Sequence, residues 1–557
     1  MPLPAIFSCA RQPRWWALLI IGSWIAHSVA TLSLLPPWTM VPVLAGWLGL
    51  GWLFRWGAPR RPREPTRVWP WSLLPIAIGG LYVYLADSFG DVDLGAVFFH
   101  LQAGMEDHGG ADRNIAAVLY TFSMVLLLIA FTWLIRVDHR WRLSERPLAL
   151  LLLASNPLFY GVGQRSASIV TDDGAWLERR YVAPVINEAP ADPPNLLLLY
   201  LESIERTYAD TERFGDAYAD LAALGQRARV FEGIQQLDNT GWTMAGMIAT
   251  QCGAPLMPAG LLHDSQFEPL GKVVPGVDCL GDLLDEQGYH LTYMGGASTA
   301  FAGKGIFYED HGFDRVMGRE ELSPRLDDPD YLNNWGLYDD TLYDITVEEV
   351  RQLSQGEAPW AIVNLSLTGH APEGYPARRC EQRQGDYDGI DILYSVKCSA
   401  WLARDLIDRL EDEGLLENTL VVIASDHLTM RVSAWEQLVS GERYNTFMLL
   451  GNDVPPGNVD RSASTLDVFP TILEAMSFEI DEHRAGLGVS LLSPYPTLVE
   501  QHGVENVNTR MREETALQNR LWEGLVPEQQ HDEEASTTEQ VVETPEDATG
   551  EQPADVQ

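Results

Sequence analysis

Hydrophobic and polar residues are distributed differently in the two parts of this chain. In the first third, five apolar stretches approach the roughly twenty residues that span a bilayer core. They are 15–35, 38–54, 69–86, 115–135 and 147–162. Each fits a buried core helix as well, but several such runs with tryptophan at their ends favour membrane spans. Residues 1–165 are therefore predicted to form a transmembrane domain of about five helices.

Arginine placement predicts the orientation of these spans. Arginines precede the first span and follow the second and the fourth, whereas the loop between the third and fourth spans is acidic. Because positively charged loops stay in the cytoplasm, the N-terminus is predicted inside and everything beyond about residue 165 outside. The first span has no clear small-residue cleavage site, so it is predicted to be retained.

Beyond the spans, short apolar runs alternate with helical patterns between about residues 195 and 492. The runs are NLLLLYLE, HLTYMGG, AIVNLSLTGH, LVVIASDH and NTFMLLG. This alternation is typical of an α/β fold with a mostly parallel sheet covered by helices, in which ligands bind beyond the carboxyl ends of the strands. We predict a linker over 166–194 and a globular domain over 195–500.

The end of the chain has a different composition. From about Glu505 it is rich in Glu, Gln, Thr and Pro and poor in apolar residues. Such a segment buries too little apolar surface to offset the entropy of ordering, so 501–557 is predicted to be an acidic disordered tail.

The net charge and the cysteines bear on the partners of this chain and on its redox compartment. The net charge of −40 argues against a nucleic-acid partner, which needs basic surface. Four of the five cysteines fall on the outer side of the membrane, where disulfides persist. They permit three pairings, of which Cys252–Cys279 with Cys380–Cys398 closes short loops; free buried thiols are the alternative.

Polar side chains follow several of the predicted strands. Glu202 ends the first run, His370 the third, and Asp426 with His427 the fourth. Singly, each fits a helix cap, a turn or an exposed loop. Together with the Thr240 hydroxyl, the two carboxylates and His427 offer three oxygens and one nitrogen. That set suits Mn²⁺ or Mg²⁺ better than a thiolate zinc site.

Thr240 lies near the start of the segment DNTGWTMAGMIATQCG, whose polar beginning and apolar continuation predict a helix N-terminus. A helix cap is the ordinary interpretation of Asn-Thr. The alternative is a nucleophile at the helix N-terminus, where backbone N–H groups favour a phosphate. Thr243 is expected inside the helix, bonded to a preceding carbonyl, and Ser203 is the most credible rival hydroxyl.

Seven segments of the outer region carry a family resemblance. In order, they are YLESIERTY, NTGWTMAGMIATQCG, GGASTAFAGKGIFYEDHGFD, WGLYDDTLYD, LTGHAPEGY, SVKCSAWL and ASDHL. They resemble the successive motifs of the phosphoglycerol transferase I family, which belongs to the alkaline phosphatase/sulfatase superfamily and is related to lipoteichoic acid synthases. The resemblance covers about residues 195–480, and its QCG, RRC and VKC motifs are closer to the glucan-modifying branch.

The resemblance assigns roles to residues by motif. It implies that Thr240 becomes phosphoglycerylated and also binds the metal. It implies that Glu202, Asp426 and His427 complete a Mn²⁺ site, which Mg²⁺ also fits. His370 resembles the histidine beside the transferred group. Lys304 stands where lipoteichoic acid synthases carry an arginine that holds glycerol phosphate. A lysine ammonium would bind the phosphate as a point charge, without the two parallel hydrogen bonds of a guanidinium.

The implied activity is the transfer of phosphoglycerol from phosphatidylglycerol to periplasmic membrane-derived oligosaccharides (osmoregulated periplasmic glucans). Diacylglycerol leaves, and a phosphothreonine intermediate carries the group. The resemblance implies a multi-pass protein of the bacterial inner membrane with its catalytic domain in the periplasm.

Other activities use related chemistry. A phosphoethanolamine transferase, or an enzyme like lipoteichoic acid synthase acting on another envelope glycan or lipid, would need the same metal set. A sulfatase needs Cys or Ser in a C/S-x-P-x-R context, which CGAPL at Cys252 does not supply. A non-catalytic membrane sensor would have no need for a full set of metal ligands.

Overall fold

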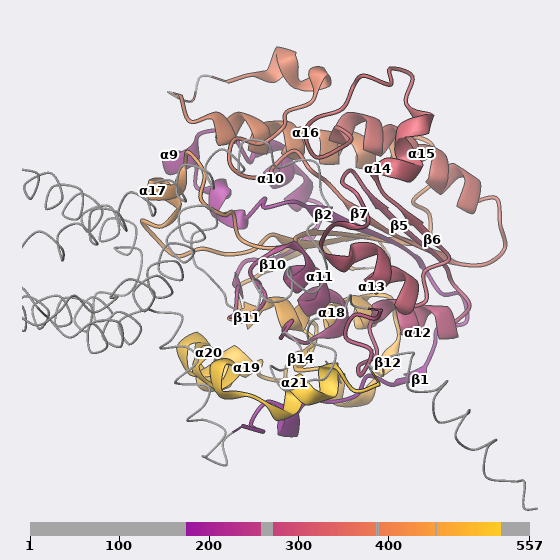
Figure 1. The fold of residues 1–557 in the computed structure, drawn as a ribbon, viewed down its shortest axis with the longest axis vertical. Helices are drawn as coiled ribbons and strands as arrows, with labels where there is room; N and C mark the ends of the chain where they lie inside the picture. The colour runs from indigo at the N-terminus through magenta and orange to yellow at the C-terminus, as the bar shows by residue number, and fades with distance from the viewer. Residues whose placement is uncertain (1–173, 258–270, 386, 388, 452–453, 525–557) are drawn as a thin grey trace, which may run out of the picture.

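The computed structural model describes residues 174–524, apart from 258–270, 386, 388 and 452–453. Within this part of the chain, eight strands form the central sheet in the order β10-β3-β9-β8-β2-β7-β5-β6 (Figure 1). Their bounds are β10 Gly457–Val459, β3 Arg229–Phe231, β9 Phe447–Gly451, β8 Thr419–Ser425, β2 Asn195–Leu201, β7 Trp360–Leu365, β5 His290–Gly295 and β6 Arg315–Met317. All neighbours pair in parallel except at β9, which is antiparallel to both β3 and β8.

Helices cover both faces of this sheet (Figure 1). One face carries α10 Ala219–Gly225, α14 Arg319–Leu322, α15 Asp339–Leu353 and α16 Asp391–Asp412. The other carries α11 Thr243–Cys252, α12 Leu280–Glu286, α13 Lys304–Asp310 and α18 Val468–Ala475. Short helices α9 Thr211–Phe214 and α17 Trp435–Leu438 lie at one end.

Strand β2 shows why the sequence forms a sheet buried on both faces. Its run NLLLLYL contains no charged residue, and successive side chains point to opposite faces. Leu197 and Leu199 pack with α10, α15 and α16, whereas Leu198 and Tyr200 pack with α11, α12 and α18. The five apolar runs of the sequence correspond to β2, β5, β7, β8 and β9, so the predicted α/β fold with a mostly parallel sheet is confirmed.

Short strand pairs and three C-terminal helices surround this core. The pairs are β1 Ile186–Glu188 with β12 Glu479–Ile480, β4 Ile234–Gln235 with β11 Ala463–Ser464, and β13 Arg484–Ala485 with β14 Gly488–Val489. The helices are α19 Leu498–His502, α20 Val504–Glu513 and α21 Ala516–Leu521. The prediction of a disordered tail from residue 501 is therefore wrong for 501–524. Within α20, Val507 and Met511 lie on one helical face and are buried, which stabilises a helix in an otherwise polar sequence.

These C-terminal helices hold the segment that enters the domain, Gly174–Val182, which we call the entry segment. Leu177 is fully buried, and its N–H donates to Glu514 Oε2 at 2.7 Å. The Gly174 carbonyl accepts hydrogen bonds from the N–H groups of Thr515 and Ala516, each at 2.9 Å. The predicted linker is thus, over this stretch, part of the packed domain.

Two truncations should distinguish the contribution of α20 and α21 to stability from that of the residues after Gly524. A chain that ends at Gly503 loses the buried side chains of α20 and α21, and the burial of each contributes about 1.5–3 kcal/mol to stability. It also leaves the Leu177 N–H without its acceptor, Glu514. We expect it to lose several kcal/mol of unfolding free energy, while a chain that ends at Gly524 keeps the wild-type value. Denaturant titration of the three proteins measures this, and equal midpoints for both truncations would contradict the role of α20 and α21.

No helix in the described part of the chain is long and apolar enough to cross a bilayer. The five predicted spans all lie outside the described residues.

Candidate functional site

The sheet register brings the predicted acidic and imidazole groups together. Leu201 at the end of β2 lies opposite Ser425 at the end of β8, so Glu202 and Asp426 follow in neighbouring positions. His427 comes next in the chain. The ligand atoms of Glu202, Asp426 and His427 all lie within 4.8 Å of one another, and the three side chains are buried.

The geometry of this cluster fits a divalent cation. The Nδ1–H of His427 donates to the Leu428 carbonyl at 2.8 Å, so Nε2 is the ring nitrogen that could offer a lone pair to a cation. That nitrogen faces Glu202 Oε1 and Asp426 Oδ2, each at 3.4 Å. Neither Asp426 Oδ2 nor His427 Nε2 has a hydrogen-bond partner among the described residues. Two carboxylates and one imidazole nitrogen that converge in a buried space are donors that suit a divalent cation.

The charges of the cluster act strongly on one another. Burial, followed by the charge of Glu202, raises the pKa of Asp426. Burial alone would raise the pKa of Glu202 as well, but its contact with His427 outweighs this, and its pKa is lowered. The pKa of His427 is raised, because its acidic neighbours outweigh the effect of burial. The two buried carboxylates thus resist ionising together, and a bound cation would favour the charged form of both.

Two glycines let the surrounding segments close on this cluster. A Cβ at Gly246 in α11 would lie 1.7 Å from the Asp426 carbonyl oxygen, and one at Gly369 would lie 2.1 Å from the Glu202 carbonyl oxygen. Only glycine permits approaches this close. They set the N-terminal half of α11 and the loop after β7 directly against the two acidic residues.

Helix α11 does not begin where the sequence predicts. Its first residue is Thr243, with Trp242 in the N-cap position, so Thr240 is not its cap. Thr240 is fully buried, and its hydroxyl donates to the Leu237 carbonyl at 2.8 Å and accepts from the Leu237 N–H at 3.1 Å. Asn239 has a φ of 60°, so the Asn-Thr-Gly sequence makes a tight turn ahead of the helix.

Thr243 places its hydroxyl beside the cluster at the start of α11. Its Oγ1 donates to Glu202 Oε2 at 3.4 Å, and the side chain is partly exposed. A threonine in the first helical position has no helical carbonyl behind it, which leaves this hydroxyl uncommitted to the backbone. The Trp242 side chain does not cap the helix. These contacts favour Thr243 over Thr240 as a group that can meet a phosphate at the helix N-terminus.

Ser203 supports the cluster through its backbone. Its N–H donates to Asp426 Oδ1 at 2.9 Å, its hydroxyl donates to Glu202 Oε1 at 3.2 Å, and its carbonyl accepts from the Thr429 hydroxyl at 2.6 Å. A φ of 61° at this serine bends the chain sharply after Glu202. Ser203 thus positions both carboxylates.

His370 and Lys304 flank a pair of aromatic rings. His370 lies on the loop after β7, close enough for its charge to act on Glu202, and its ring centroid is 4.4 Å from that of Trp335. Trp335 meets Phe301 edge-on at 5.4 Å, and the Lys304 ammonium lies 4.6 Å from the Phe301 ring centre. Lys304 is buried at the first position of α13. The nucleophile candidate Thr243 and this aromatic pair are the site residues that the sequence reasoning missed.

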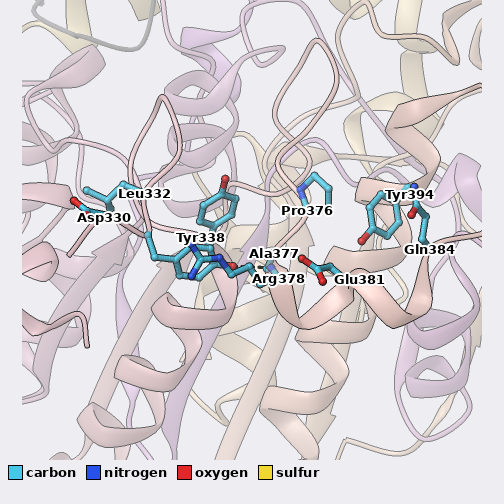
Figure 2. A pocket seen from close by; sticks show the side chains of 10 residues that line it. Asp330, Leu332, Tyr338, Pro376, Ala377, Arg378, Glu381, Gln384 and Tyr394 are labelled. Atoms are coloured by element: carbon cyan, nitrogen blue, oxygen red, sulfur yellow. Dashed lines mark hydrogen bonds between the residues drawn. The ribbon is translucent and has the colours of Figure 1, made fainter. Parts of the chain in front are cut away.

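Two segments that contact or contain His370 also contribute residues to a cavity of about 390 Å³, whose lining is drawn in Figure 2. The loop before α15 contains Trp335 at the histidine and Tyr331 and Tyr338 in the cavity wall. The segment that follows His370 reaches the cavity with Pro376, Ala377 and Arg378. Both segments thus contribute to the cavity lining and to the surroundings of His370.

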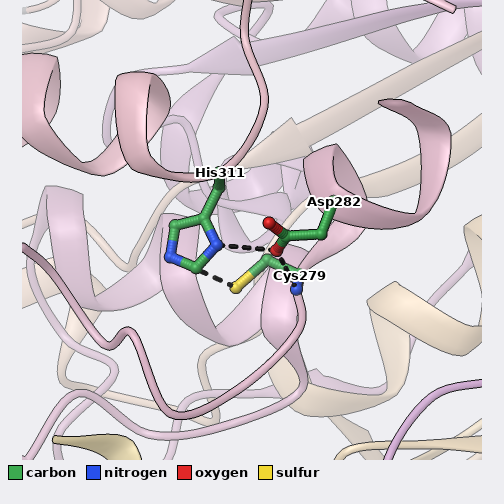
Figure 3. A group of neighbouring side chains, drawn as sticks. All are labelled: Cys279, Asp282 and His311. Carbon is green, nitrogen blue, oxygen red and sulfur yellow. Dashed lines mark hydrogen bonds and ion pairs between the residues drawn. The ribbon is translucent and has the colours of Figure 1, made fainter. Parts of the chain in front are cut away.

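A second cluster of metal-ligand types has a different character. Cys279, Asp282 and His311 meet beside α12 (Figure 3), but the Cys279 sulfur is bonded to Cys252 and has no thiolate to offer a metal. His311 Nδ1 lies 2.7 Å from Asp282 Oδ2 and its Nε2 lies 2.9 Å from the Val273 carbonyl. Both neighbours are acceptors, so the arrangement suits a protonated imidazole. The structure also contains the predicted Cys380–Cys398 bond.

This imidazole should make stability depend on pH. Burial alone would lower the pKa of His311, but the hydrogen bond and charge of Asp282 raise it above 6.5. A raised folded-state pKa stabilises the fold below about pH 6.5, and this contribution is lost as pH rises through the folded-state value. We expect the melting temperature of wild type to fall over that interval and the His311→Gln protein to lack this part of the fall. His290→Gln, at an exposed histidine, is the control, and identical pH profiles for wild type and His311→Gln would refute the role.

Comparison with known proteins places the domain. The sulfatase family model matches residues 194–478, just over half of the chain. Phosphoglycerol transferase I from Citrobacter koseri is 31% identical over 439 residues, and its counterpart from Escherichia fergusonii is 30% identical over the same length. Each match covers 76% of this chain and 57% of the relative, so the chain spans little more than half the length of these curated relatives.

Among solved structures, a protein of the alkaline phosphatase superfamily from Vibrio parahaemolyticus has a TM-score of 0.47 and 21% identity. That match covers 60% of this chain and 78% of the other. A likeness at this level adds no argument, and the assignment rests on the family model. The chain belongs to the sulfatase family.

Proposed function

We propose that this protein transfers phosphoglycerol from phosphatidylglycerol to periplasmic membrane-derived oligosaccharides and releases diacylglycerol. One observation carries the proposal: the Thr243 hydroxyl lies at a helix N-terminus and 3.4 Å from a carboxylate of the buried acidic cluster. A nucleophile, a cation site and open backbone N–H groups in one place are the parts that phosphoryl transfer needs. Relatives named phosphoglycerol transferase I support the choice of group.

The first step attaches the phosphoglyceryl group to Thr243. The Thr243 Oγ forms a bond to the phosphorus of phosphatidylglycerol while the bond from phosphorus to the diacylglycerol oxygen breaks. The hydroxyl proton is removed and the leaving oxygen gains one, with His370 as the group that exchanges protons. The Nδ1–H of His370 donates to the Ala371 carbonyl at 2.8 Å, so we assign the proton exchange to its Nε2. The first N–H groups of α11 stabilise charge on the phosphoryl oxygens.

The second step transfers the phosphoglyceryl group from Thr243 to the acceptor. A sugar hydroxyl attacks the phosphorus of phosphothreonine, the bond from phosphorus to Thr243 Oγ breaks, and the proton of the sugar hydroxyl returns by way of His370 to the threonine. The buried ammonium of Lys304, beside Phe301, supplies a positive charge for the glycerol phosphate. We assign it this role as a point charge.

Glu202, Asp426 and His427 would hold the metal, which we propose to be Mn²⁺ or Mg²⁺. A divalent cation bound there would lower the pKa of the threonine hydroxyl and neutralise charge on the phosphoryl group. We propose, from the five predicted spans and the arginine distribution, that the domain lies at the outer face of a bacterial inner membrane, next to its lipid donor. This location is part of the proposal.

The same site chemistry would serve a phosphoethanolamine transferase. The test is to incubate the purified protein in vesicles with phosphatidylglycerol labelled in its glycerol headgroup, with Mn²⁺, and with or without a glucan acceptor. We expect diacylglycerol release and label on the glucan. Release only from phosphatidylethanolamine vesicles would replace the proposed donor, and no release from either lipid would reject the activity.

A further inference from the structure

We propose that the cavity beside the His370 loop binds the neutral oligosaccharide acceptor, an inference that rests on the proposed transferase function. We call this cavity the tyrosine cavity. It is lined by Asp330, Tyr331, Leu332, Tyr338, Pro376, Ala377, Arg378, Glu381, Gln384 and Tyr394 (Figure 2). Its volume of about 390 Å³ falls in the range of small-molecule sites.

The position of the cavity suits an acceptor. Its two connecting segments each touch the reaction centre, one through Trp335 and the other through His370 itself. Pro376 lies six positions after His370, and an extended chain of that length spans at most about 20 Å. A saccharide seated in the cavity can therefore extend toward the histidine that exchanges its proton.

One wall is a fixed stack of flat groups. The Arg378 guanidinium lies 4.0 Å from the Tyr331 ring centre, and Tyr331 stacks on Tyr338 at 4.5 Å with the planes 15° apart. The Tyr331 hydroxyl donates to Asp340 Oδ2 at 3.1 Å and accepts from the Arg378 N–H at 2.6 Å, which fixes the stack in place. Tyrosine offers an apolar face with a polar edge, which matches the mixed C–H and hydroxyl surface of a sugar ring.

The opposite wall supplies hydrogen-bonding groups and is covalently braced. Glu381 and Gln384 are exposed, and Tyr394 is partly exposed on α16. The Cys380–Cys398 disulfide joins the segment of Glu381 to α16, and Cys398 lies one helical turn beyond Tyr394. The bond therefore holds Glu381 and Tyr394 at a set spacing, with acceptors and donors that suit sugar hydroxyls.

The charge of the cavity favours a neutral ligand over a phospholipid. Asp330 and Glu381 contribute two carboxylates, while the charge of Arg378 is paired with Asp328 at 2.8 Å. An anionic headgroup would meet uncompensated negative charge there. A polyol instead donates hydrogen bonds to the carboxylates, so the lipid and the saccharide have separate sites.

The test measures how the loaded protein divides its phosphoglycerol between sugar and water. The full chain in phosphatidylglycerol vesicles with Mn²⁺ receives an unbranched glucose oligosaccharide, and glycerophosphoryl-saccharide and free glycerol phosphate are quantified together. We expect Glu381→Ala and Tyr394→Ala to lower the ratio of the two products at least tenfold. The matched controls Glu417→Ala and Tyr495→Ala, at exposed sites outside the cavity, should keep the wild-type ratio. A wild-type ratio in both cavity variants would overturn the proposal.

A binding measurement keeps this result apart from failure of the transferase function. Calorimetric titration of the same oligosaccharide into wild type should show binding that Glu381→Ala and Tyr394→Ala weaken at least tenfold and that short-chain phosphatidylglycerol does not displace. If wild type releases no diacylglycerol yet binds the sugar in this way, the transferase function fails and the cavity stands. Absence of sugar binding to wild type, or displacement by the lipid, would reject the cavity as the acceptor site.

Discussion

Replacing Thr243 by alanine should lower turnover by at least roughly a thousandfold, because the variant lacks the oxygen that would carry the phosphoglyceryl group. The fold should survive, since the side chain is partly exposed and makes one long hydrogen bond, to Glu202. Diacylglycerol release from phosphatidylglycerol vesicles measures the loss. Without acceptor, wild type should accumulate a phosphoglyceryl adduct that peptide fragmentation assigns to Thr243.

Thr240→Val is the matched control three residues away. It removes a buried hydroxyl that both donates to and accepts from the backbone of Leu237, so it should cost about 1–3 kcal/mol of unfolding free energy. The adduct on Thr243 should still form in it. An adduct on Thr240 or Ser203, or near-normal turnover of Thr243→Ala, would show that the nucleophile is another hydroxyl.

Replacing Asp426 by asparagine should have opposite effects with and without metal. In the metal-free protein the change removes one of two facing buried carboxylates and leaves an amide that donates where Asp426 Oδ2 lacks a partner. Asparagine Oδ1 can still accept from the N–H groups of Ser203 and His427. We expect the chelated variant to melt at least as high as chelated wild type. Its Mn²⁺ affinity should fall at least about a hundredfold.

The measurement is the melting temperature over a Mn²⁺ titration. Mn²⁺ should raise the melting temperature of wild type and leave that of Asp426→Asn unchanged. Asp467→Asn is the control, because Asp467 is a buried carboxylate that accepts from Ser464 and Val489 away from this cluster. It should keep the metal-induced rise. A wild-type melting temperature that does not change with Mn²⁺, or full wild-type activity with chelator present, would contradict the cation site.

The sequence was sufficient for the sheet and for the acidic cluster. Uncharged runs such as NLLLLYL predict buried parallel strands, and parallel strands in register bring the residues that follow them to one edge. This is why Glu202, Asp426 and His427 could be grouped before their positions were known.

The nucleophile could not be predicted in the same way. Helix boundaries are uncertain by one or two residues, and Asn-Thr-Gly is as typical of a turn as of a cap. With the helix start at Thr243, the Thr240 hydroxyl is buried and the partly exposed Thr243 hydroxyl lies at the N-terminus of α11. The meeting of Phe301 with Trp335 depends on tertiary packing between distant segments, for which the sequence has no local signal. The polar composition of α20 predicted disorder, although its two buried side chains, Val507 and Met511, stabilise a helix.

The grip of the C-terminal helices on the entry segment bears on how a protease could liberate this domain. A cut at an exposed residue such as Glu188, Ala189, Ala191 or Asp192 would break the backbone. It would leave Leu177 buried, the Glu178–Arg520 ion pair intact and Gly174 bonded to Thr515. The two fragments would stay together as a nicked complex. Release of the domain from the proposed membrane spans would therefore require a cut ahead of Gly174, or prior removal of α20 and α21. Nicking and release would be separate events that gel mobility and sedimentation distinguish.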